Sequence, residues 1–486
     1  MKHVDILIKP DMENIQATDF FNSKKIEQRG VIAARDCYKQ LKNLSDSIQI
    51  DSLSIKKLKA PQKIYISDIK VENLRYVNKS FVIGKGQIFA GSFATREEIN
   101  KAIDRIYGTQ YFKKVNYELI KKATNKYKLI YRVKENTRFI VKGALHYDNH
   151  RGAGLIINGT MRNILVQNSR INIKGIISKN PGIRTSIYKY FGKRQDLMAN
   201  YFFSFDKTEL PVNYQGSNIG NYSYQFLKTG FSTKYNYKHN RQFGIDLSYE
   251  KNSIFPGPAI KSIIPNANFN NYKLGGFALK LHYKLNTLNS HYFPTKGSKI
   301  NMLFKRTFRP ITSYSIDEDQ SLDEEIFRLN LEPFNNFYIH GEHHILLSDK
   351  YSFSINGSVG LTSAKSPITS FYALGGTMPE NNFNYQQFPG YSFGEKITPN
   401  FIKAGGALDF LITSRIFLTV SGGIGMFSGR ASNVYSDLTN SSWNDYFKGY
   451  AAGIRFDSIL GPLKFMVGDV NTDGNVRWYL NLGYTF

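Results

Sequence analysis

The sequence predicts a mainly β protein, an antiparallel transmembrane β-barrel of about sixteen strands that follows one small α+β domain. From Arg138 onward, apolar and polar residues alternate through segment after segment, which is the period of β-strands. The mean hydropathy is only −0.36, and no window approaches the roughly eighteen apolar residues of a transmembrane helix. The 32 Tyr and 36 Phe residues fit a barrel, because only every other residue of its strands faces lipid.

The last nine residues carry the strand on which the barrel prediction depends most. Large apolar residues occupy alternate positions and give one apolar face with an aromatic residue at each end, as expected between two interfacial girdles. An edge strand of a soluble sandwich would also alternate, but it would gain nothing from such a face. We therefore expect a C-terminal insertion signal, read by the barrel-assembly machinery and formed by Trp478, Leu480, Leu482, Tyr484 and Phe486.

The chain is basic, with 64 Lys and Arg against 38 Asp and Glu and a net charge of +26. Such a charge favours anionic partners, which for a barrel are membrane lipids and lipopolysaccharide. The even spread of lysines also fits a generally basic protein without a specific anionic partner. No nucleic-acid-binding motif accompanies the charge, so we expect no nucleic acid as partner. The single Cys37 excludes an internal disulfide.

The first ten residues contain no apolar stretch of signal-peptide length, because Asp5 interrupts the only candidate. An outer-membrane protein must be exported. Either the export signal lies on sequence outside this chain or the barrel prediction is wrong, and we favour the first explanation.

Residues 1–45 are too few to close a core of their own, since they predict only a short buried strand at 4–11 and one helix at 26–44. They resemble the C-terminal edge of a patatin-like phospholipase domain. The resemblance rests on that strand, on Asp19-Phe20, and on Gly30-Val31-Ile32-Ala33-Ala34 at the start of the helix. Residues 46–61 are polar and rich in Ser and Lys, and are expected to form a linker.

Residues 62–136 predict the small α+β domain. Its first strand changes phase at Ser67-Asp68, which suggests a bulge, and a short helical or turn segment follows near 80–83. Thr95-Arg96-Glu97-Glu98 is a capping box, and Gly108 is expected to end that helix in a left-handed conformation. The apolar face of the helix contains Ile99, Ala102, Ile103, Ile106 and Tyr107. Two alternating strands at 115–119 and 127–133 complete the domain.

The order strand, helix, helix, strand, strand resembles a POTRA domain, the periplasmic module of the outer-membrane insertase and two-partner-secretion superfamily. The stretch from Ile106 to Val115 is similar to the segment that joins the second helix of that domain to its second strand. The alternative is an unrelated α+β domain. The resemblance implies that the N-terminal region lies in the periplasm.

Residues 138–486 predict the barrel, with strands near 139, 151, 169, 183, 195, 223, 240, 272, 296, 335, 351, 399, 415, 448, 461 and 477. An even number of strands is required of single-chain bacterial barrels. Tight turns and long connections should alternate between the two ends, the long ones at 206–221, 253–271, 308–327, 363–398 and 428–447.

Several barrel segments resemble the same superfamily, including the turn from Leu288 to Gly297 and the strand that begins at Gly461-Pro462. In that superfamily the connection corresponding to 363–398 folds back into the lumen on an Arg-Gly-aromatic motif. The matching residues are Phe388, Pro389, Gly390 and Tyr391. Because Pro389 stands where the resemblance expects Arg, the usual charged anchoring of this loop is in doubt.

Three patterns suggest chemistry without supporting it, so we assign no catalytic, cofactor or metal residue. Gly390–Gly394 spells G-x-S-x-G around Ser392, but no helical pattern follows it. His340 and His344 fall on one face of a strand and His343 on the other, so they do not converge on a metal. The acidic residues of 317–325 lack the glycine of an EF-hand and fit a solvated loop.

The combined resemblance is to the patatin-fused branch of the surface-antigen superfamily, the type five-d autotransporter arrangement of hydrolase, POTRA domain and barrel. It implies a translocator and anchor, without its enzyme in this chain, for a passenger or upstream hydrolase domain. Two alternatives stay open. The chain is the membrane half of a split lipolytic enzyme, or it inserts other barrels into the outer membrane.

Overall fold

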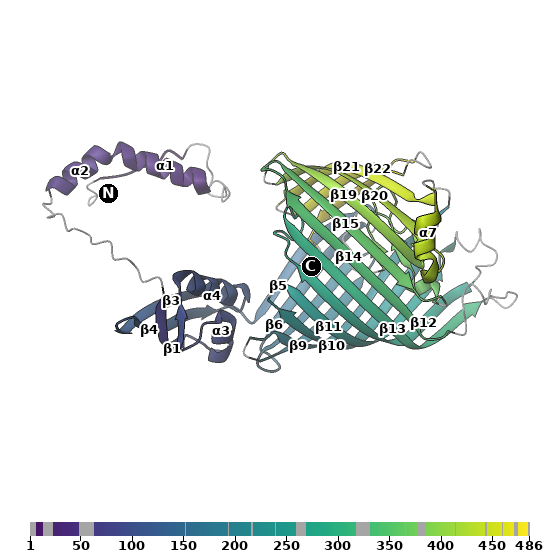
Figure 1. Cartoon of the computed structure of the whole chain (residues 1–486), viewed down its shortest axis with the longest axis horizontal. Helices are drawn as coiled ribbons and strands as arrows, with labels where there is room; N and C mark the ends of the chain where they lie inside the picture. Colours follow the sequence, from purple (N-terminus) through teal and green to yellow (C-terminus); the bar gives the residue numbers. More distant parts are fainter. Residues whose placement is uncertain are drawn as a thin grey trace. The chain divides into compact units, whose positions relative to one another are not determined.

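The computed structural model describes residues 6–12, 23–47, 63–150, 152–192, 194–214, 217–238, 240–258, 269–316, 331–364, 366–376, 384–413, 415–442, 445–458, 460–470 and 475–484 (Figure 1). The chain divides into two units, Met1–Gln62 and Lys63–Phe486, which we take separately. None of the described helices is long and apolar enough to span a membrane.

The first unit contains two helices, α1 (Ser23–Asp36) and α2 (Tyr38–Ser47). The prediction of one continuous helix at 26–44 was therefore wrong at Cys37, although backbone bonds from Cys37 to Ala33 (3.3 Å) and from Leu41 to Cys37 (3.0 Å) keep the helices nearly continuous. Residues 6–12 form no strand, contrary to the prediction for 4–11, and positions 4–5 lie outside the described residues, as does Asp19-Phe20. A strand needs a sheet partner to satisfy its backbone, and no strand is described in this unit.

The second unit begins with the expected α+β domain, a four-stranded sheet with the order β2-β1-β4-β3 and two helices. Its elements are β1 (Ile64–Glu72), α3 (Lys79–Gly86), β2 (Ser92–Ala94), α4 (Arg96–Gly108), β3 (Phe112–Ala123) and β4 (Lys126–Glu135). The register of β1 on β4 shifts between Ile66 and Asp68, which is the predicted bulge. The short edge strand β2 was not predicted, because three residues carry too little alternation.

Helix α4 packs against the sheet through Ile99, Ala102 and Ile106, each at most 1% exposed. The capping box at Thr95 is formed from both sides. Gly108, however, is not left-handed; the helix passes through Thr109 in a right-handed conformation, and Gln110 takes the positive φ of 59°. Tyr107 is 56% exposed and does not belong to the buried face. The buried face is thus narrower than the pattern of apolar residues suggested.

A closed barrel of sixteen antiparallel strands follows, and every predicted strand has its counterpart. The strands are β5 (Phe139–Asp148), β6 (Gly152–Arg162), β7 (Ser169–Ser178), β8 (Gly182–Phe191), β9 (Leu197–Tyr214), β10 (Ser217–Tyr237), β11 (Arg241–Pro256), β12 (Phe269–Asn286), β13 (Gly297–Ile316), β14 (Phe334–Leu346), β15 (Tyr351–Thr362), β19 (Asn400–Leu411), β20 (Ile416–Ser428), β21 (Phe447–Ser458), β22 (Gly461–Asp469) and β23 (Arg477–Gly483).

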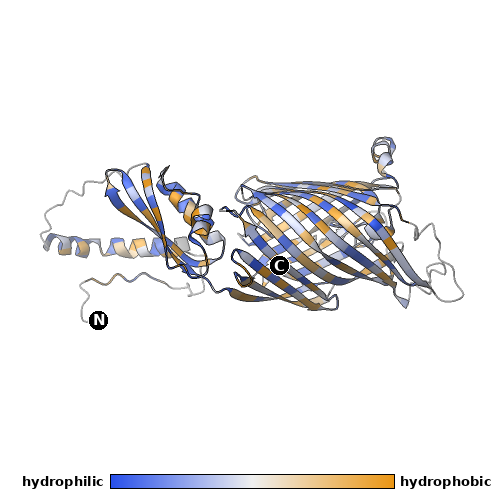
Figure 2. Ribbon diagram, turned by 90° about the horizontal axis from the view of Figure 1, so that it is seen from below, coloured by the Kyte–Doolittle hydropathy of each residue, from blue (hydrophilic) through white to orange (hydrophobic). Residues whose placement is uncertain are grey.

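Alternating residues of these strands face outward and inward (Figure 2). In β15, Tyr351, Phe353 and Ile355 are exposed on the outer face, whereas Ser352 and Ser354 are buried inside. A transmembrane barrel requires this distribution, because its outer face contacts lipid and its interior is polar.

The connections confirm the predicted alternation of ends, although several strands extend into the predicted long connections, as β13 does by continuing to Ile316. The long connections follow β11, β13, β15 and β20, at the end away from the start of β5. The segment 206–221 is not a loop, because β9 and β10 continue to Tyr214 and from Ser217. Because β9 and β10 pair with each other there, their backbone hydrogen bonds are satisfied without the membrane, and the strands continue where a loop was predicted.

Candidate functional site: the barrel interior and its terminal seam

The connection between β15 and β19, which we call the lumen loop (363–399), packs its apolar residues against the inner barrel wall. It contains a small sheet of β16 (Tyr372–Leu374), β17 (Tyr385–Gln386) and β18 (Lys396–Thr398). A buried cluster joins loop residues to wall residues and consists of Tyr338, Tyr372, Leu374, Phe388, Tyr391, Phe401, Phe447 and Val470. The loop is therefore part of the barrel's core.

The four predicted motif residues lie where this loop meets strands β20 to β22. Phe388 is 1% exposed, and its ring centroid lies 4.6 Å from that of Phe447. Gly390 has φ of +84°, and a Cβ atom there would lie 3.1 Å from the Cα of Gly449. Only glycine allows the loop backbone to approach the wall so closely. Tyr391 is 5% exposed, and its carbonyl accepts a 2.6 Å hydrogen bond from the Tyr479 hydroxyl.

The charged anchor that Pro389 cannot supply comes from another pair. Glu395 of the lumen loop forms a bidentate ion pair with Arg477 of β23, at 2.9 Å from Nη2 to Oε1 and 3.0 Å from Nε to Oε2. Both side chains are almost fully buried. The resemblance implied an arginine on the loop. Here the charges are exchanged, because the loop carries the carboxylate and the barrel wall carries the guanidinium. This pair was not predicted from the sequence, although Arg477 does continue the inward face of the terminal strand.

The first and last strands of the barrel meet at a short seam, which we call the terminal seam. Strand β23 pairs with β5 at only three positions, from Asn481 opposite Asp148 to Gly483 opposite His146, whereas β5 pairs with β6 at ten. Asn149 adds hydrogen bonds to the backbone of Trp478 and Leu480. Each missing pair leaves strand edges without ladder hydrogen bonds, so this seam is the weakest part of the described wall.

The residues expected to form the insertion signal lie along this seam. Trp478 is 52% exposed on the outer face, Leu480 and Leu482 are half-buried, and Tyr484 follows the end of β23. Phe486 lies outside the described residues. The alternation of an apolar outer face is thus present from Trp478 to Leu482.

The turn between β12 and β13, which we call the mouth turn (287–296), reaches strands on other parts of the wall. The ring of Phe293 lies 5.6 Å from that of Phe417 in β20 and 5.2 Å from the guanidinium carbon of Arg455 in β21. The ring of Tyr292 lies 5.7 Å from that of Tyr484. In the order of the barrel strands, these partners are several strands away from β12 and β13, so the turn extends across this end of the barrel.

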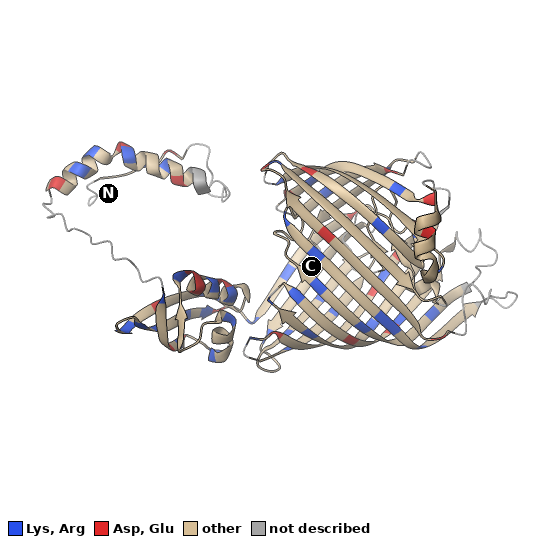
Figure 3. Cartoon of the chain, viewed as in Figure 1, with Lys and Arg blue, Asp and Glu red and all other residues tan. Residues whose placement is uncertain are grey.

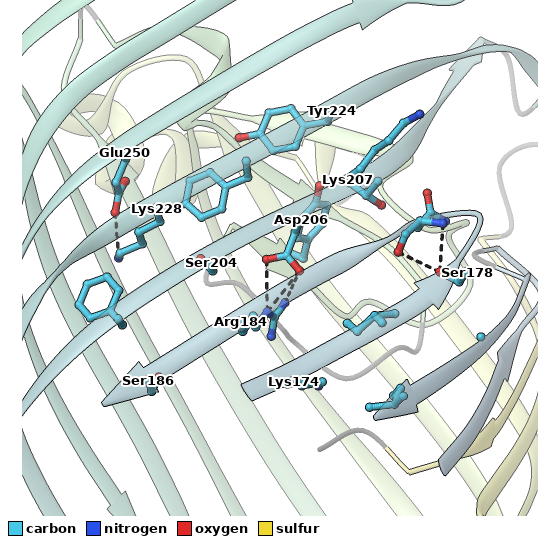
Figure 4. Close-up of a pocket in the computed structure, with 18 of the residues that line it drawn as sticks. Lys174, Ser178, Arg184, Ser186, Ser204, Asp206, Lys207, Tyr224, Lys228 and Glu250 are labelled. Atoms are coloured by element: carbon cyan, nitrogen blue, oxygen red, sulfur yellow. Dashed lines mark hydrogen bonds and ion pairs between the residues drawn. The ribbon is translucent and has the colours of Figure 1, made fainter. Parts of the chain in front are cut away.

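Charged residues of both signs occur on the barrel strands (Figure 3), and one group of them borders a cavity of about 520 Å³ against β6 to β12. Two ion pairs stand out in Figure 4: Arg184 with Asp206 at 3.0 Å, and Lys228 with Glu250 at 2.9 Å. Hydroxyl groups of Ser178, Ser186 and Ser204 and several aromatic rings complete its lining.

The remaining sequence patterns have simple structural explanations. His343 is exposed on the opposite face from His340 and His344, as predicted. His340 and His344 are buried on the inner face, where their Nε2 atoms lie 3.8 and 3.9 Å from the same carboxylate oxygen of Glu342. No group of metal-ligating side chains able to hold an ion occurs in the described ranges. Ser392 lies in a turn, where its N–H donates to Glu395, and no helix follows it. The acidic positions 317–325 lie outside the described residues.

Comparisons with known proteins agree with this architecture. The family profile of the OMP85 superfamily matches residues 127–486. The fold is similar to that of BamA from Haemophilus ducreyi lacking POTRA domains 1–3, with a TM-score of 0.61, 15% sequence identity, and coverage of 86% of this chain and 84% of that chain. It is also similar to CdiB from Acinetobacter baumannii, with a TM-score of 0.50, 11% identity, and coverage of 87% and 74%. A search of curated proteins finds no match.

The profile extends from the last strand of the α+β domain through the whole barrel, which is well over half of the sequence. The closed barrel with its lumen loop is thus a bacterial outer-membrane β-barrel, and the chain belongs to the OMP85 superfamily.

Proposed function

We propose that this protein moves a polypeptide across the outer membrane, along the side of its barrel that carries the charged cavity. One observation carries the proposal. The aromatic cluster of the lumen loop lies against strands from β14 to β22, whereas the charged cavity of about 520 Å³ lies against β6 to β12, with Tyr385 of the loop in its lining. A barrel of this size that was packed throughout with side chains would leave no polar path.

The α+β domain is proposed to be a POTRA-like module on the periplasmic side that receives the polypeptide before it enters the barrel. The sheet order β2-β1-β4-β3, with α3 and α4 between β1 and β3 along the chain, supports this assignment. So does the tight passage from α4 into β3 through Thr109 and Gln110, which corresponds to the stretch on which the resemblance rested.

A finer proposal concerns residues 1–45, which we infer to be the edge of a patatin-like hydrolase domain carried by the barrel. Four apolar residues of α1 and α2 are 37–65% exposed, namely Val31, Ile32, Tyr38 and Leu41. Large apolar side chains grouped on short helices favour a covering partner. A hydrolase domain that packs on these helices would provide that cover. Loss of that domain's binding in Ile32→Asp, but not in Lys39→Asp, would support this proposal, and equal binding would refute it.

The translocation proposal can be tested with an epitope fused before residue 1 and a supplied export signal. We expect protease added to intact cells to reach the epitope. Ser204→Trp, which places a large side chain in the cavity, should prevent this, whereas Phe205→Trp on the opposite face of β9 should not. Heat-modifiable migration of each variant verifies barrel assembly. An epitope that stays protected behind an assembled wild-type barrel would refute the proposal.

A second candidate function is insertion of other barrels into the membrane, and the terminal seam favours it. Tyr147 and Leu482 are directly paired across that seam, so cysteines at both positions are close enough for a disulfide. In a Cys37→Ser background, oxidation of this pair should stop assembly of a client barrel if the seam must open. Undiminished client assembly with the seam fully cross-linked would exclude this function.

A further inference from the structure

The cavity against β6 to β12 has an excess of positive charge. Five lysines and one arginine line it, against three carboxylates, Asp206, Asp246 and Glu250. Each of these carboxylates already has a cationic partner, because Asp246 pairs with Lys280 at 3.2 Å and the other two pair as described above. Glu250 accepts a second lysine, Lys305, at 3.2 Å. The three carboxylates therefore balance only part of the positive charge on the cavity wall.

The cations are also close enough to act on one another. Arg184 repels Lys174 and Lys228 repels Lys280, although Asp206 offsets part of the first repulsion, and Asp246 and Glu250 offset part of the second. Like charges held together in a partly buried site raise the free energy of the empty cavity, and an anion that enters lowers it. This effect favours anionic over cationic or neutral ligands.

The arrangement of the cations fits an extended ligand better than a compact one. Arg184, Lys228 and Lys280 are held in ion pairs with the three wall carboxylates. The remaining lining cations come from three different strands, with Lys174 on β7, Lys207 on β9 and Lys234 on β10. The two ion pairs drawn in Figure 4 lie apart on the wall, and where Lys228 and Lys305 converge the point between them is already occupied by the carboxylate of Glu250. Carboxylates spaced along a chain can meet these positions one at a time.

The uncharged lining has the chemistry of a peptide site. Ser186 and Ser204 offer hydroxyl groups to backbone amides, and the rings of Phe202 and Tyr224 offer surfaces to apolar side chains. A cavity of about 520 Å³ is within the usual range for a bound segment of small-ligand size.

We propose that this cavity binds acidic, extended polypeptide segments, so that the passenger of the barrel presents glutamate and aspartate to the wall formed by β7 to β12. The inference rests on the proposed translocation, because it names the class of segment that the lumen accepts. It adds a recognition site on the barrel wall to a pathway whose first contact is proposed at the POTRA-like domain.

The test measures binding in detergent, where no translocation is needed. A fluorescein-labelled glutamate-rich peptide is titrated with the full-length protein, and anisotropy is compared with that of a lysine-rich peptide of equal length. We expect binding of the acidic peptide only, weakened by added salt because ions screen the interaction. Excess inorganic pyrophosphate should compete poorly; competition at low concentration would mean that the site recognises a compact phosphate and would overturn the peptide assignment.

Two variants locate the site. Lys174→Gln with Lys234→Gln removes two lining cations and should weaken binding of the acidic peptide about tenfold or more, since a charge-assisted hydrogen bond contributes roughly a factor of ten. Lys251→Gln is the matched control, because Lys251 follows Glu250 in β11 and is exposed on the opposite face. Heat-modifiable migration verifies folding of both.

Equal affinity of the double variant and wild type, or equal binding of both peptides to wild type, would overturn the proposal; the second comparison does not depend on the variants. The outcomes separate the two proposals. Peptide binding without passage of the fused epitope would refute translocation alone, and passage without peptide binding would refute the acidic site alone.

Discussion

Removing the buried guanidinium of Arg477 should detach the lumen loop from the last strand of the barrel. In Arg477→Met the carboxylate of Glu395 loses two hydrogen bonds and keeps only the Ser392 N–H, at 2.7 Å. Glu395 and Arg477 are 6% and 7% exposed, so water replaces little of the loss. Breaking one side of a buried pair typically costs about 3–5 kcal/mol. The double variant Glu395→Leu with Arg477→Met leaves no unpaired charge and should recover much of that stability.

Urea unfolding in detergent micelles, followed by intrinsic fluorescence, gives the free energies for this double-mutant cycle. The coupling between the two positions should be about 2 kcal/mol or more, within the range of residues that share one network. Arg430→Met is the control, because Arg430 is exposed at the start of the connection that follows β20. A coupling below about 0.5 kcal/mol, the usual error of additivity, would mean that the pair does not hold the loop.

Four further outcomes are expected. In the isolated α+β domain, Ile106→Ala should lower the free energy of unfolding by about 2–5 kcal/mol, which is most of the stability of so small a domain, so the variant should be unfolded at room temperature. Lys101→Ala on the exposed face should leave the domain folded, and equal circular-dichroism melts of the two variants would refute this packing. Hydrogen bonds from Thr95 lower the pKa of Glu98 in the folded domain. The ionised Glu98 therefore contributes stability above its ordinary pKa of 4.5, and this stability is lost as the pH falls through the folded pKa. Glu98→Gln should accordingly flatten the dependence of the melting temperature on pH in the acid range. Phe293→Ala should raise ion conductance in planar bilayers by loosening the mouth turn, and unchanged conductance would contradict that role. Deletion of Phe486 should reduce heat-modifiable barrel in the outer membrane, and normal assembly would exclude an insertion signal there.

The positions of the barrel strands could be predicted because a membrane imposes one rule on every strand that crosses it. Lipid on one side and a polar interior on the other force alternation, so segments such as Tyr351–Ile355 are recognisable one by one. The rule weakens beyond the membrane, which is why the continuation of β9 to Tyr214 was taken for a loop. The end of α4 was misplaced for a similar reason, since Gly108 permits a left-handed turn but Gln110 adopts it.

The contacts of the candidate site were largely beyond local pattern. The motif around Gly390 was found because glycine next to aromatic residues marks a close backbone approach, and the structure does place it against the wall. Glu395 and Arg477 are 82 positions apart in the sequence, and neither belongs to a recognisable motif. Only the fold brings them together. The missing Arg at position 389 was the one sequence signal that an anchor had to come from elsewhere.

These contacts explain how the last strand can keep its place with so short a ladder. Strand β23 has six paired positions with β22 but three with β5, so its backbone alone holds it mainly from one side. The lumen loop adds the Arg477 ion pair and the Tyr479 hydroxyl bond from within, and the mouth turn contacts Tyr484. Because two of these contacts come from the lumen loop, a passenger that displaces the loop would remove both of them and weaken the hold on the β5 side of β23. Movement in the lumen and opening of the terminal seam are therefore expected to be coupled.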